Sequence, residues 1–132
     1  MTGGSGFMGR RLASQLLSRG HRVCCLVRPG SQKKLAAGVE PVIGDALDIA
    51  SYQAVVTPAD TFVHLVGVSH PNPSKAAQFD DIDARSAKNA IAAAMQSGVK
   101  HFVYVSVAQP APIMQASCTG RLMAPSASMG SI

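Results

Sequence analysis

The stretch Thr2-Gly-Gly-Ser-Gly-Phe-Met-Gly9 decides the fold, because it sets glycines at positions 3, 6 and 9 directly ahead of a helical pattern. In such a loop the first glycine allows a tight turn, the second lets a pyrophosphate approach the backbone, and the third lets the helix pack closely. The N-terminus of the helix then offers free N–H groups and a partial positive charge to phosphate oxygens. Taken alone, the stretch also suits a flexible N-terminal leader, so the interpretation depends on the residues that follow.

The residues after this glycine loop alternate between helical and strand patterns. Met8, Leu12 and Leu16 recur at every fourth position and predict a helix over 7–19 that Gly20 stops. The later segments predict strands over 22–27, 39–43, 61–66 and 101–107, short helices over 32–37 and 49–56, and a long, alanine-rich helix over 75–97. Strands that are apolar on both faces and alternate with helices are typical of a parallel sheet covered on both sides. The predicted fold class is therefore α/β, a Rossmann-like doubly wound parallel sheet.

The two ends of the sequence depart from this pattern. The chain opens directly on the glycine loop, so the strand that lies at the centre of a doubly wound sheet, between the second and the fourth, is missing. Residues 117–132 show neither helical periodicity nor strand alternation. We expect residues 1–116 to be one incomplete domain and residues 117–132 to be an irregular tail, out of frame or prematurely ended. Neither end of the chain is then expected to be native.

Composition excludes several classes of protein. Hydrophobic residues make up 47% of the chain and charged residues 14%, which predicts a buried core instead of disorder. No apolar run is long enough for a membrane-spanning helix, and the start lacks the charged-then-apolar pattern of a leader. The three cysteines have neither disulfide nor metal-ligand spacing. We therefore expect a reduced, cytoplasmic protein without a metal site.

The net charge of +5 is concentrated around the glycine loop. Residues 1–44 hold seven basic residues against one acid, a surplus that attracts a polyanion such as a nucleotide phosphate or nucleic acid. Nucleic acid is disfavoured because no aromatic residues interleave with the basic ones to form a stacking platform. An NTPase loop is disfavoured as well, because Arg10 and Arg11 follow Gly9 where that motif needs Lys and then Ser or Thr.

Taken together, the motifs resemble those of the short-chain dehydrogenase/reductase superfamily. The glycine loop is similar to its fingerprint, and Phe7-Met8 resembles the Phe-Ile pair of the extended or atypical branch, with its NmrA-like proteins and relatives of an accessory subunit of respiratory complex I. Similar segments also close the second strand, follow the third, and lie in the fourth and fifth: Val27-Arg-Pro29, Gly44-Asp-Ala-Leu-Asp48, Val63-His-Leu-Val-Gly67 and Val99-Lys-His-Phe-Val-Tyr-Val-Ser-Val107. The resemblance covers about residues 2–116.

The resemblance implies a dinucleotide cofactor and assigns residues to it. The pyrophosphate is expected against the glycine loop, at Gly3, Gly6, Phe7, Met8 and Gly9. Arg28 stands where an NAD-specific protein has an acid, and would favour the 2′-phosphate of NADP over NAD. Asp45 with Ala46 would meet the adenine, and the path to the nicotinamide ribose would be lined by Leu65, Val66 and Gly67. The residues alone leave two alternatives open: Arg28 as a solvated strand-end charge, and Asp45 as the cap of a turn.

Catalytic residues are harder to assign. Ser106 matches the serine that family members carry at the end of the fifth strand, although an ordinary strand-end serine describes it equally well. The Tyr-x-x-x-Lys pair used in hydride transfer is absent, since no Tyr follows Tyr104 and no Lys follows Lys100. The predicted function is the NAD(P)-binding domain of an oxidoreductase. The alternative is a non-catalytic redox sensor or accessory subunit, and a protein partner is left open.

Two more predictions concern residues outside these motifs. His64 is predicted to be a core histidine and not a metal ligand, because no second ligand has suitable spacing. Asp80, Asp81 and Asp83 are predicted to form the solvated start of the long helix, where acids suit the helix dipole.

Overall fold

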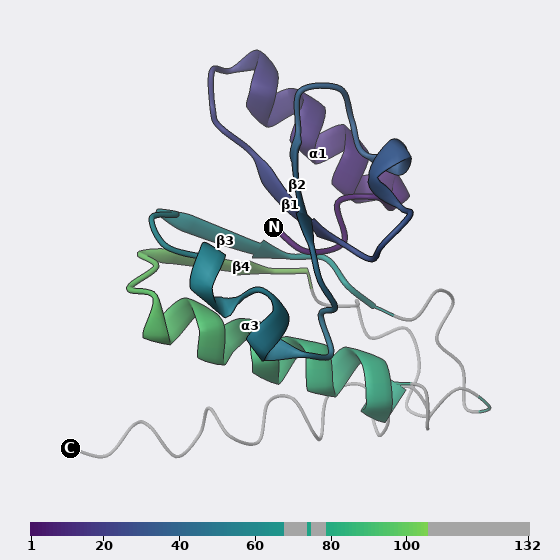
Figure 1. Cartoon of the computed structure of the whole chain (residues 1–132), viewed down its shortest axis with the longest axis vertical. Helices are drawn as coiled ribbons and strands as arrows, with labels where there is room; N and C mark the ends of the chain where they lie inside the picture. The colour runs from purple at the N-terminus through teal and green to yellow at the C-terminus, as the bar shows by residue number, and fades with distance from the viewer. Residues whose placement is uncertain (68–73, 75–78, 106–132) are drawn as a thin grey trace.

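The computed structural model describes residues 1–67, 74 and 79–105. Ser106 and the predicted tail over 117–132 lie outside these residues, as do the start of the long predicted helix and the end of the last predicted strand. Within them, strands and helices alternate along the chain, which confirms the α/β class (Figure 1).

Two pairs of parallel strands form the sheet. Strand β1 (Cys24–Val27) pairs with β2 (Glu40–Ile43), and β3 (Thr61–His64) pairs with β4 (His101–Tyr104). Thr2 makes parallel bridges to Leu26 on one side and to His64 on the other. The order across the sheet is therefore β2, β1, Thr2, β3 and β4, which is the order of a doubly wound fold.

Met1 and Thr2 take the place of the first strand. The Met1 amino group donates to the Cys24 carbonyl oxygen at 2.6 Å, and Leu26 N donates to the Met1 carbonyl oxygen at 2.8 Å. On the other side, Thr2 N donates to the Val63 carbonyl oxygen at 2.9 Å. As the sequence predicted, no strand precedes α1, and Met1 and Thr2 alone pair with the two strands beside that position. Figure 1 accordingly shows the N-terminus between the two strand pairs.

In the part of the chain that the structure describes, two α-helices accompany the strand pairs, α1 (Phe7–Ser18) beside β1 and β2, and α3 (Arg85–Gln96) beside β3 and β4 (Figure 1). Helix α1 ends at Ser18, just before the predicted stop at Gly20, whose φ of +83° suits a helix terminus. A π-helical turn, η5 (Phe79–Ala84), leads directly into α3.

The two short predicted helices are wrong in type. The segment over 32–37 contains only the 3₁₀ turn η1 (Gln32–Lys34). The segment over 49–56 contains two 3₁₀ turns, η2 (Ile49–Ser51) and η3 (Gln53–Val55). So few residues cannot offset the cost of nucleating an α-helix, and 3₁₀ turns are the usual form of such connectors.

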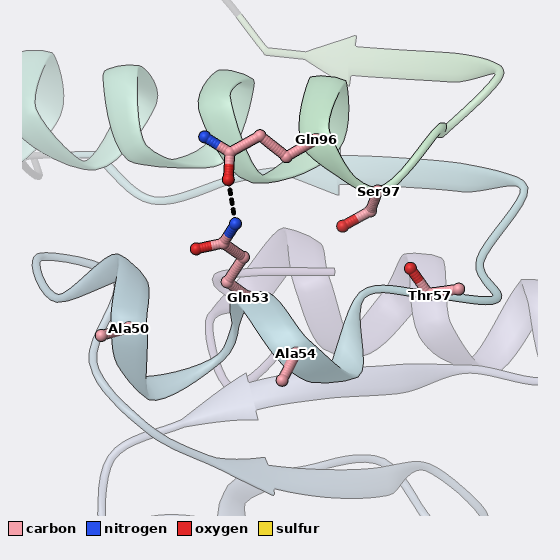
Figure 2. Close-up of a pocket in the computed structure, with 6 residues that line it drawn as sticks. All are labelled: Ala50, Gln53, Ala54, Thr57, Gln96 and Ser97. Carbon is pink, nitrogen blue, oxygen red and sulfur yellow. Dashed lines mark hydrogen bonds between the residues drawn. The ribbon is translucent and has the colours of Figure 1, made fainter.

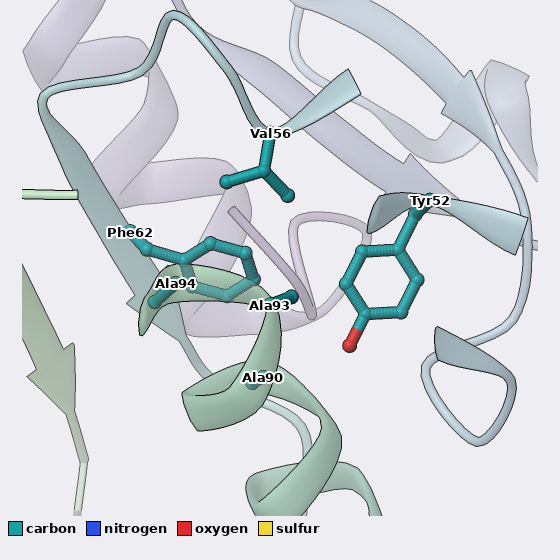
Figure 3. Close-up of a cluster of buried hydrophobic side chains, with 6 residues drawn as sticks. All are labelled: Tyr52, Val56, Phe62, Ala90, Ala93 and Ala94. Carbon is teal, nitrogen blue, oxygen red and sulfur yellow. The ribbon is translucent and has the colours of Figure 1, made fainter. Parts of the chain in front are cut away.

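Two hydrophobic clusters form the core, one beside each strand pair. Ala13 of α1 packs with Val23 and Cys25 in the smaller cluster. In the larger one, the rings of Tyr52 and Phe62 lie 6.5 Å apart and pack over three alanines of α3 (Figure 3). Methyl side chains let α3 approach the sheet closely, so the alanine-rich pattern of this helix reflects its contact with two aromatic rings.

The two outer strands of the sheet are largely exposed. In β4, Phe102, Val103 and Tyr104 are all exposed, with Val103 at 45%. In β2 only Val42 is partly buried. Among the described residues β2 and β4 are the outer members of the strand order, and each has one neighbouring strand instead of two.

Candidate functional site

The predicted cofactor segments meet at one edge of the sheet. The glycine loop follows Thr2, Arg28 follows β1, Asp45 comes shortly after β2, and residues 65–67 follow β3. Because all of these strands run parallel, each segment leaves the sheet at its carboxyl edge. In open α/β sheets, ligands bind at this edge, where the strand order reverses. Ser106, the predicted catalytic residue, lies outside the described residues.

The glycine loop is closed on its inner side. Gly3 has a φ of +73°, and a methyl carbon added to it would lie 2.8 Å from the Leu65 carbonyl carbon. A methyl carbon on Gly9 would overlap the Gly3 carbonyl oxygen and lie 2.7 Å from the Gly4 Cα. The turn at Gly3 and the close approach of α1 to it therefore both require glycine.

The loop is open over Gly6, which is the N-cap of α1. A methyl carbon there would meet only the Gly3 carbonyl oxygen, at 3.4 Å. No side chain caps the helix start, and its first turn carries no acid. The free N–H groups and the helix dipole are thus available to an anion, so this site fits the diphosphate of a dinucleotide.

Phe7 and Met8 begin α1 beside this opening with exposed side chains. Phe7 is 66% exposed and Met8 55%. The Arg11 guanidinium lies over the Phe7 ring, 4.2 Å from its centroid, in a cation–π contact. The contact holds one positive charge close to the start of α1.

Arg28 is held by a tight turn at the end of β1. Ser31 N donates to the Arg28 carbonyl oxygen at 3.0 Å across Pro29 and Gly30, and Gly30 has a φ of +83°. Proline followed by a glycine with positive φ is the sequence of a type II turn. The Arg28 side chain is exposed, and no carboxylate among the described residues pairs with it. Its guanidinium is therefore free to bind an anion.

Asp45 caps a turn, which is one of the two roles that the sequence left open for it. Its Oδ1 accepts from Leu47 N at 2.9 Å, and its own N donates to Ser51 Oγ at 2.9 Å. The carbonyl oxygen of the next residue, Ala46, accepts from Asn89 Nδ2 at 3.2 Å. The predicted adenine segment is thereby tied to α3, a link that the sequence motifs did not reveal.

Residues 65–67 run past the glycine loop and end near a buried acid. Leu65 N donates to the Thr2 carbonyl oxygen at 3.3 Å, and both Leu65 and Val66 are half-buried. A methyl carbon added to the exposed Gly67 would lie 3.5 Å from Asp83 Oδ2. Asp83 thus belongs to the surroundings of this segment.

The prediction that Asp83 is solvated is wrong, since only 6% of it is exposed. Asp81, by contrast, is exposed as predicted. Asp83 is four residues before Ala87 and seven before Ala90, and both alanines are buried. The buried stripe of α3, extended backward at helical spacing, would therefore have identified Asp83 as an inward residue.

His64 lies in the core, fully buried between Thr2 and Ser86. Thr2 Oγ1 is 2.7 Å from its Nδ1, and Ser86 Oγ is 3.4 Å from its Nε2. Burial lowers the pKa of His64 from 6.5 to about 4, so the ring is neutral at pH 7. Within residues 1–67, 74 and 79–105, no three His, Cys, Asp or Glu side chains are grouped as metal ligands would be.

A separate hollow lies toward the amino edge of β3 and β4. Its volume is about 460 Å³, and Gln53 and Gln96 are hydrogen-bonded to each other across it (Figure 2). The other lining residues are Ala50, Ala54, Thr57 and Ser97. It contains no titratable side chain and lies away from the carboxyl edge, so it takes no part in the candidate site.

The comparison with known families agrees with this geometry. A family model described as NAD(P)H-binding matches residues 3–117. The chain belongs to this NAD(P)H-binding family.

Two relatives of this NAD(P)H-binding chain show the range of the family. It is 30% identical over 112 residues to a 3-beta-hydroxysteroid dehydrogenase of Mycolicibacterium neoaurum, covering 80% of this chain and 31% of the relative. It is 26% identical over 133 residues to the photosystem II assembly factor Ycf39 of a Synechocystis species, covering 94% and 40%. The chain thus spans about a third of the length of the relatives it matches.

A solved structure supports both the fold and the cofactor. Uronate dehydrogenase from Agrobacterium tumefaciens, complexed with NAD, is 25% identical to this chain and matches it with a TM-score of 0.61, covering 80% of this chain and 38% of the dehydrogenase. The chain is therefore a Rossmann-like NAD(P)-binding domain of the short-chain dehydrogenase/reductase type, as the sequence predicted. Among the described residues, no helix is both long and apolar enough to cross a membrane.

Proposed function

We propose that this chain is the cofactor-binding part of a cytoplasmic, NADP(H)-dependent oxidoreductase that interconverts an alcohol and a carbonyl group. The observation that carries the proposal is the open face of the glycine loop at Gly6, with the unpaired Arg28 at the same edge of the sheet. The free thiols of Cys24 and Cys25 support a reducing compartment. In this proposal residues 1–116 are the binding domain, and residues 117–132 lie outside it.

Each segment at the carboxyl edge has one task in this proposal. The glycine loop holds the diphosphate, Arg28 binds the 2′-phosphate of NADP, and Leu65, Val66 and Gly67 line the path to the nicotinamide ribose. The turn occupies one carboxylate oxygen of Asp45, and its second carboxylate oxygen contributes with Ala46 to the adenine site. When bound, the cofactor supplies or accepts the hydride of the reaction.

The description of one relative supports an oxidoreductase acting on an alcohol and a carbonyl compound. A relative is described as a hydroxysteroid dehydrogenase, which favours this substrate class. Ser106 follows β4 in the sequence, and we propose that its hydroxyl binds the reacting oxygen of the substrate. No observation on the described residues favours the redox sensor or accessory subunit that the sequence left open.

The proposal is tested by titrating the purified chain with NADPH and with NADH, using cofactor fluorescence. We expect tighter binding of NADPH, and Arg28→Ala should shrink the preference by about 1 to 3 kcal/mol, the range for a charge-assisted hydrogen bond. Arg22→Ala is the matched control, because it removes an equal charge from an exposed side chain before β1 that is paired with Glu40 at 2.7 Å. Equal affinity for the two cofactors in a folded sample would refute the NADP assignment. An equal loss in Arg22→Ala would show that net charge, and not contact, sets the preference.

A further inference from the structure

A chain of three polar side chains crosses the core beneath the candidate site. Thr2, His64 and Ser86 are each at most 1% exposed, although all three carry polar groups. They come from three different elements: the segment before the glycine loop, the end of β3 and the first turn of α3. Most buried polar groups are hydrogen-bonded, and here His64 bonds to both Thr2 and Ser86.

The hydrogen bonds around His64 allow its tautomer to be assigned. Ser86 Oγ donates to the Asp83 carbonyl oxygen at 3.2 Å, so toward His64 it acts as an acceptor. In this arrangement Nε2 of His64 carries the hydrogen and donates to Ser86 Oγ, and Nδ1 accepts from the Thr2 hydroxyl at 2.7 Å. The Tyr104 ring stacks on the imidazole, 5.8 Å between centroids. The ring is thus held at both nitrogens and on one face.

Thr2 and Ser86, the two ends of this hydrogen-bonded series, each adjoin a segment that lines the cofactor site. Thr2 precedes the turn at Gly3, and its carbonyl oxygen accepts from Leu65 N at 3.3 Å. Ser86 fixes the carbonyl oxygen of Asp83, whose carboxylate lies beside Gly67. If the imidazole moved, the glycine loop would therefore shift on one side and residues 65–67 on the other.

We propose that His64 is a positioning residue for the cofactor, which through Thr2 and Ser86 holds the glycine loop and residues 65–67 in one fixed arrangement. The inference rests on the proposed cofactor site. His64 itself touches no cofactor atom, because it is fully buried, and acts only through its two partners. Its removal should weaken cofactor binding more than a general loss of stability would.

The test compares variants of this polypeptide by NADPH titration and by thermal unfolding. Thr2→Val removes the hydroxyl at constant shape, and Ser86→Ala removes the other partner. Each should raise the Kd for NADPH by roughly three- to tenfold, the range expected when one buried hydrogen bond is lost. Thr2→Ser restores the hydroxyl and should return the Kd to the wild-type value. Ala90→Gly is the matched control, since it destabilises α3 at a fully buried position outside the chain of hydrogen bonds.

The outcomes separate positioning from stability. Wild-type affinity in both Thr2→Val and Ser86→Ala would overturn the proposal, as would an equal loss of affinity in Ala90→Gly. If Thr2→Val does not fold, Ser86→Ala decides by the same criterion. A ¹⁵N spectrum of the imidazole should show hydrogen on Nε2, and hydrogen on Nδ1 would overturn the hydrogen-bond directions. A wild-type chain that binds neither NADPH nor NADH would refute the cofactor site itself, and both proposals with it.

Discussion

Replacing Gly9 by alanine should damage the fold, whereas the same change at Gly6 should damage only cofactor binding. At Gly9 the added methyl carbon would overlap the Gly3 carbonyl oxygen and come within 2.9 Å of its carbonyl carbon. These are backbone atoms, so α1 would have to move away from the loop. At Gly6 the nearest atom is 3.4 Å away and the backbone, with φ −78° and ψ 174°, suits any residue.

The two substitutions therefore have different magnitudes. Forcing a methyl group into a closely packed backbone contact costs about 1 to 3 kcal/mol, which is a large part of a domain stability of roughly 5 to 15 kcal/mol. For Gly6→Ala the cost is a poorer N-cap, about 1 kcal/mol or less. The Gly6 methyl group, however, projects over the open helix start where the diphosphate should lie, so we expect at least about tenfold weaker NADPH binding.

Urea unfolding and NADPH titration of the two variants measure these effects side by side. Gly9→Ala should lower the free energy of unfolding, and Gly6→Ala should leave it near the wild-type value while raising the Kd. Ser14→Ala, an exposed position within α1, controls for added helix propensity, and it also removes the exposed hydrogen bond from Ser14 Oγ to the Arg10 carbonyl oxygen. If Gly6→Ala binds NADPH as tightly as the wild type, the diphosphate does not lie at this helix start, and the reasoning is refuted.

Three further predictions concern the core. The pKa of His64 is about 4 in the folded chain against 6.5 ordinarily, so on acidification the unfolded chain takes up this proton first. The free energy of unfolding, measured with urea, should therefore fall by about 3 kcal/mol as the pH drops from 6.5 to 4. His64→Asn should flatten that part of the pH profile, and an unchanged profile would contradict the assignment. Gly4→Ala would place a methyl carbon against the Cys25 Sγ and 2.9 Å from its Cβ, which should lower the melting temperature. Adding Cys25→Ala to this variant should recover part of the loss, and strictly additive losses from the two changes would contradict the contact. Tyr52→Phe should stabilise the chain by about 1 kcal/mol, because the buried Tyr52 hydroxyl has no hydrogen-bond partner among the described residues. Burial alone raises the pKa of this hydroxyl to about 12. A loss of stability in the variant would indicate that the hydroxyl has a partner.

Much of the fold could be predicted because it depends on short-range patterns. The spacing of Met8, Leu12 and Leu16 predicted α1, and the glycine at position 20 predicted its end within two residues. Runs of apolar residues predicted all four strands, although each observed strand is shorter than its run. Their order followed from the rule for doubly wound sheets and needed no knowledge of side-chain packing.

What the sequence did not predict depends on contacts between distant residues. The burial of Asp83 follows from the way α3 packs on the sheet, and the sequence around it, rich in acids, indicated a solvated helix start. Asn89 reaches Ala46 across 43 positions, for which no local pattern exists. At the site, glycine spacing located the turn, but only the structure distinguishes Gly9, closed off by backbone, from Gly6, open to a ligand.

The bridges made by Thr2 also have a consequence for the order of folding events. Thr2 and His64 are 62 positions apart, whereas β1 and β2 are joined by one short connection. Closing a longer loop costs more chain entropy, so β1 and β2 with α1 can form before Thr2 is paired with β3. Thr2 N and Leu65 N, whose hydrogen bonds join the two strand pairs, should then be among the last amides protected from hydrogen exchange during refolding. Thr2, which directly precedes the glycine loop, would in this way complete the sheet and the cofactor site in the same step.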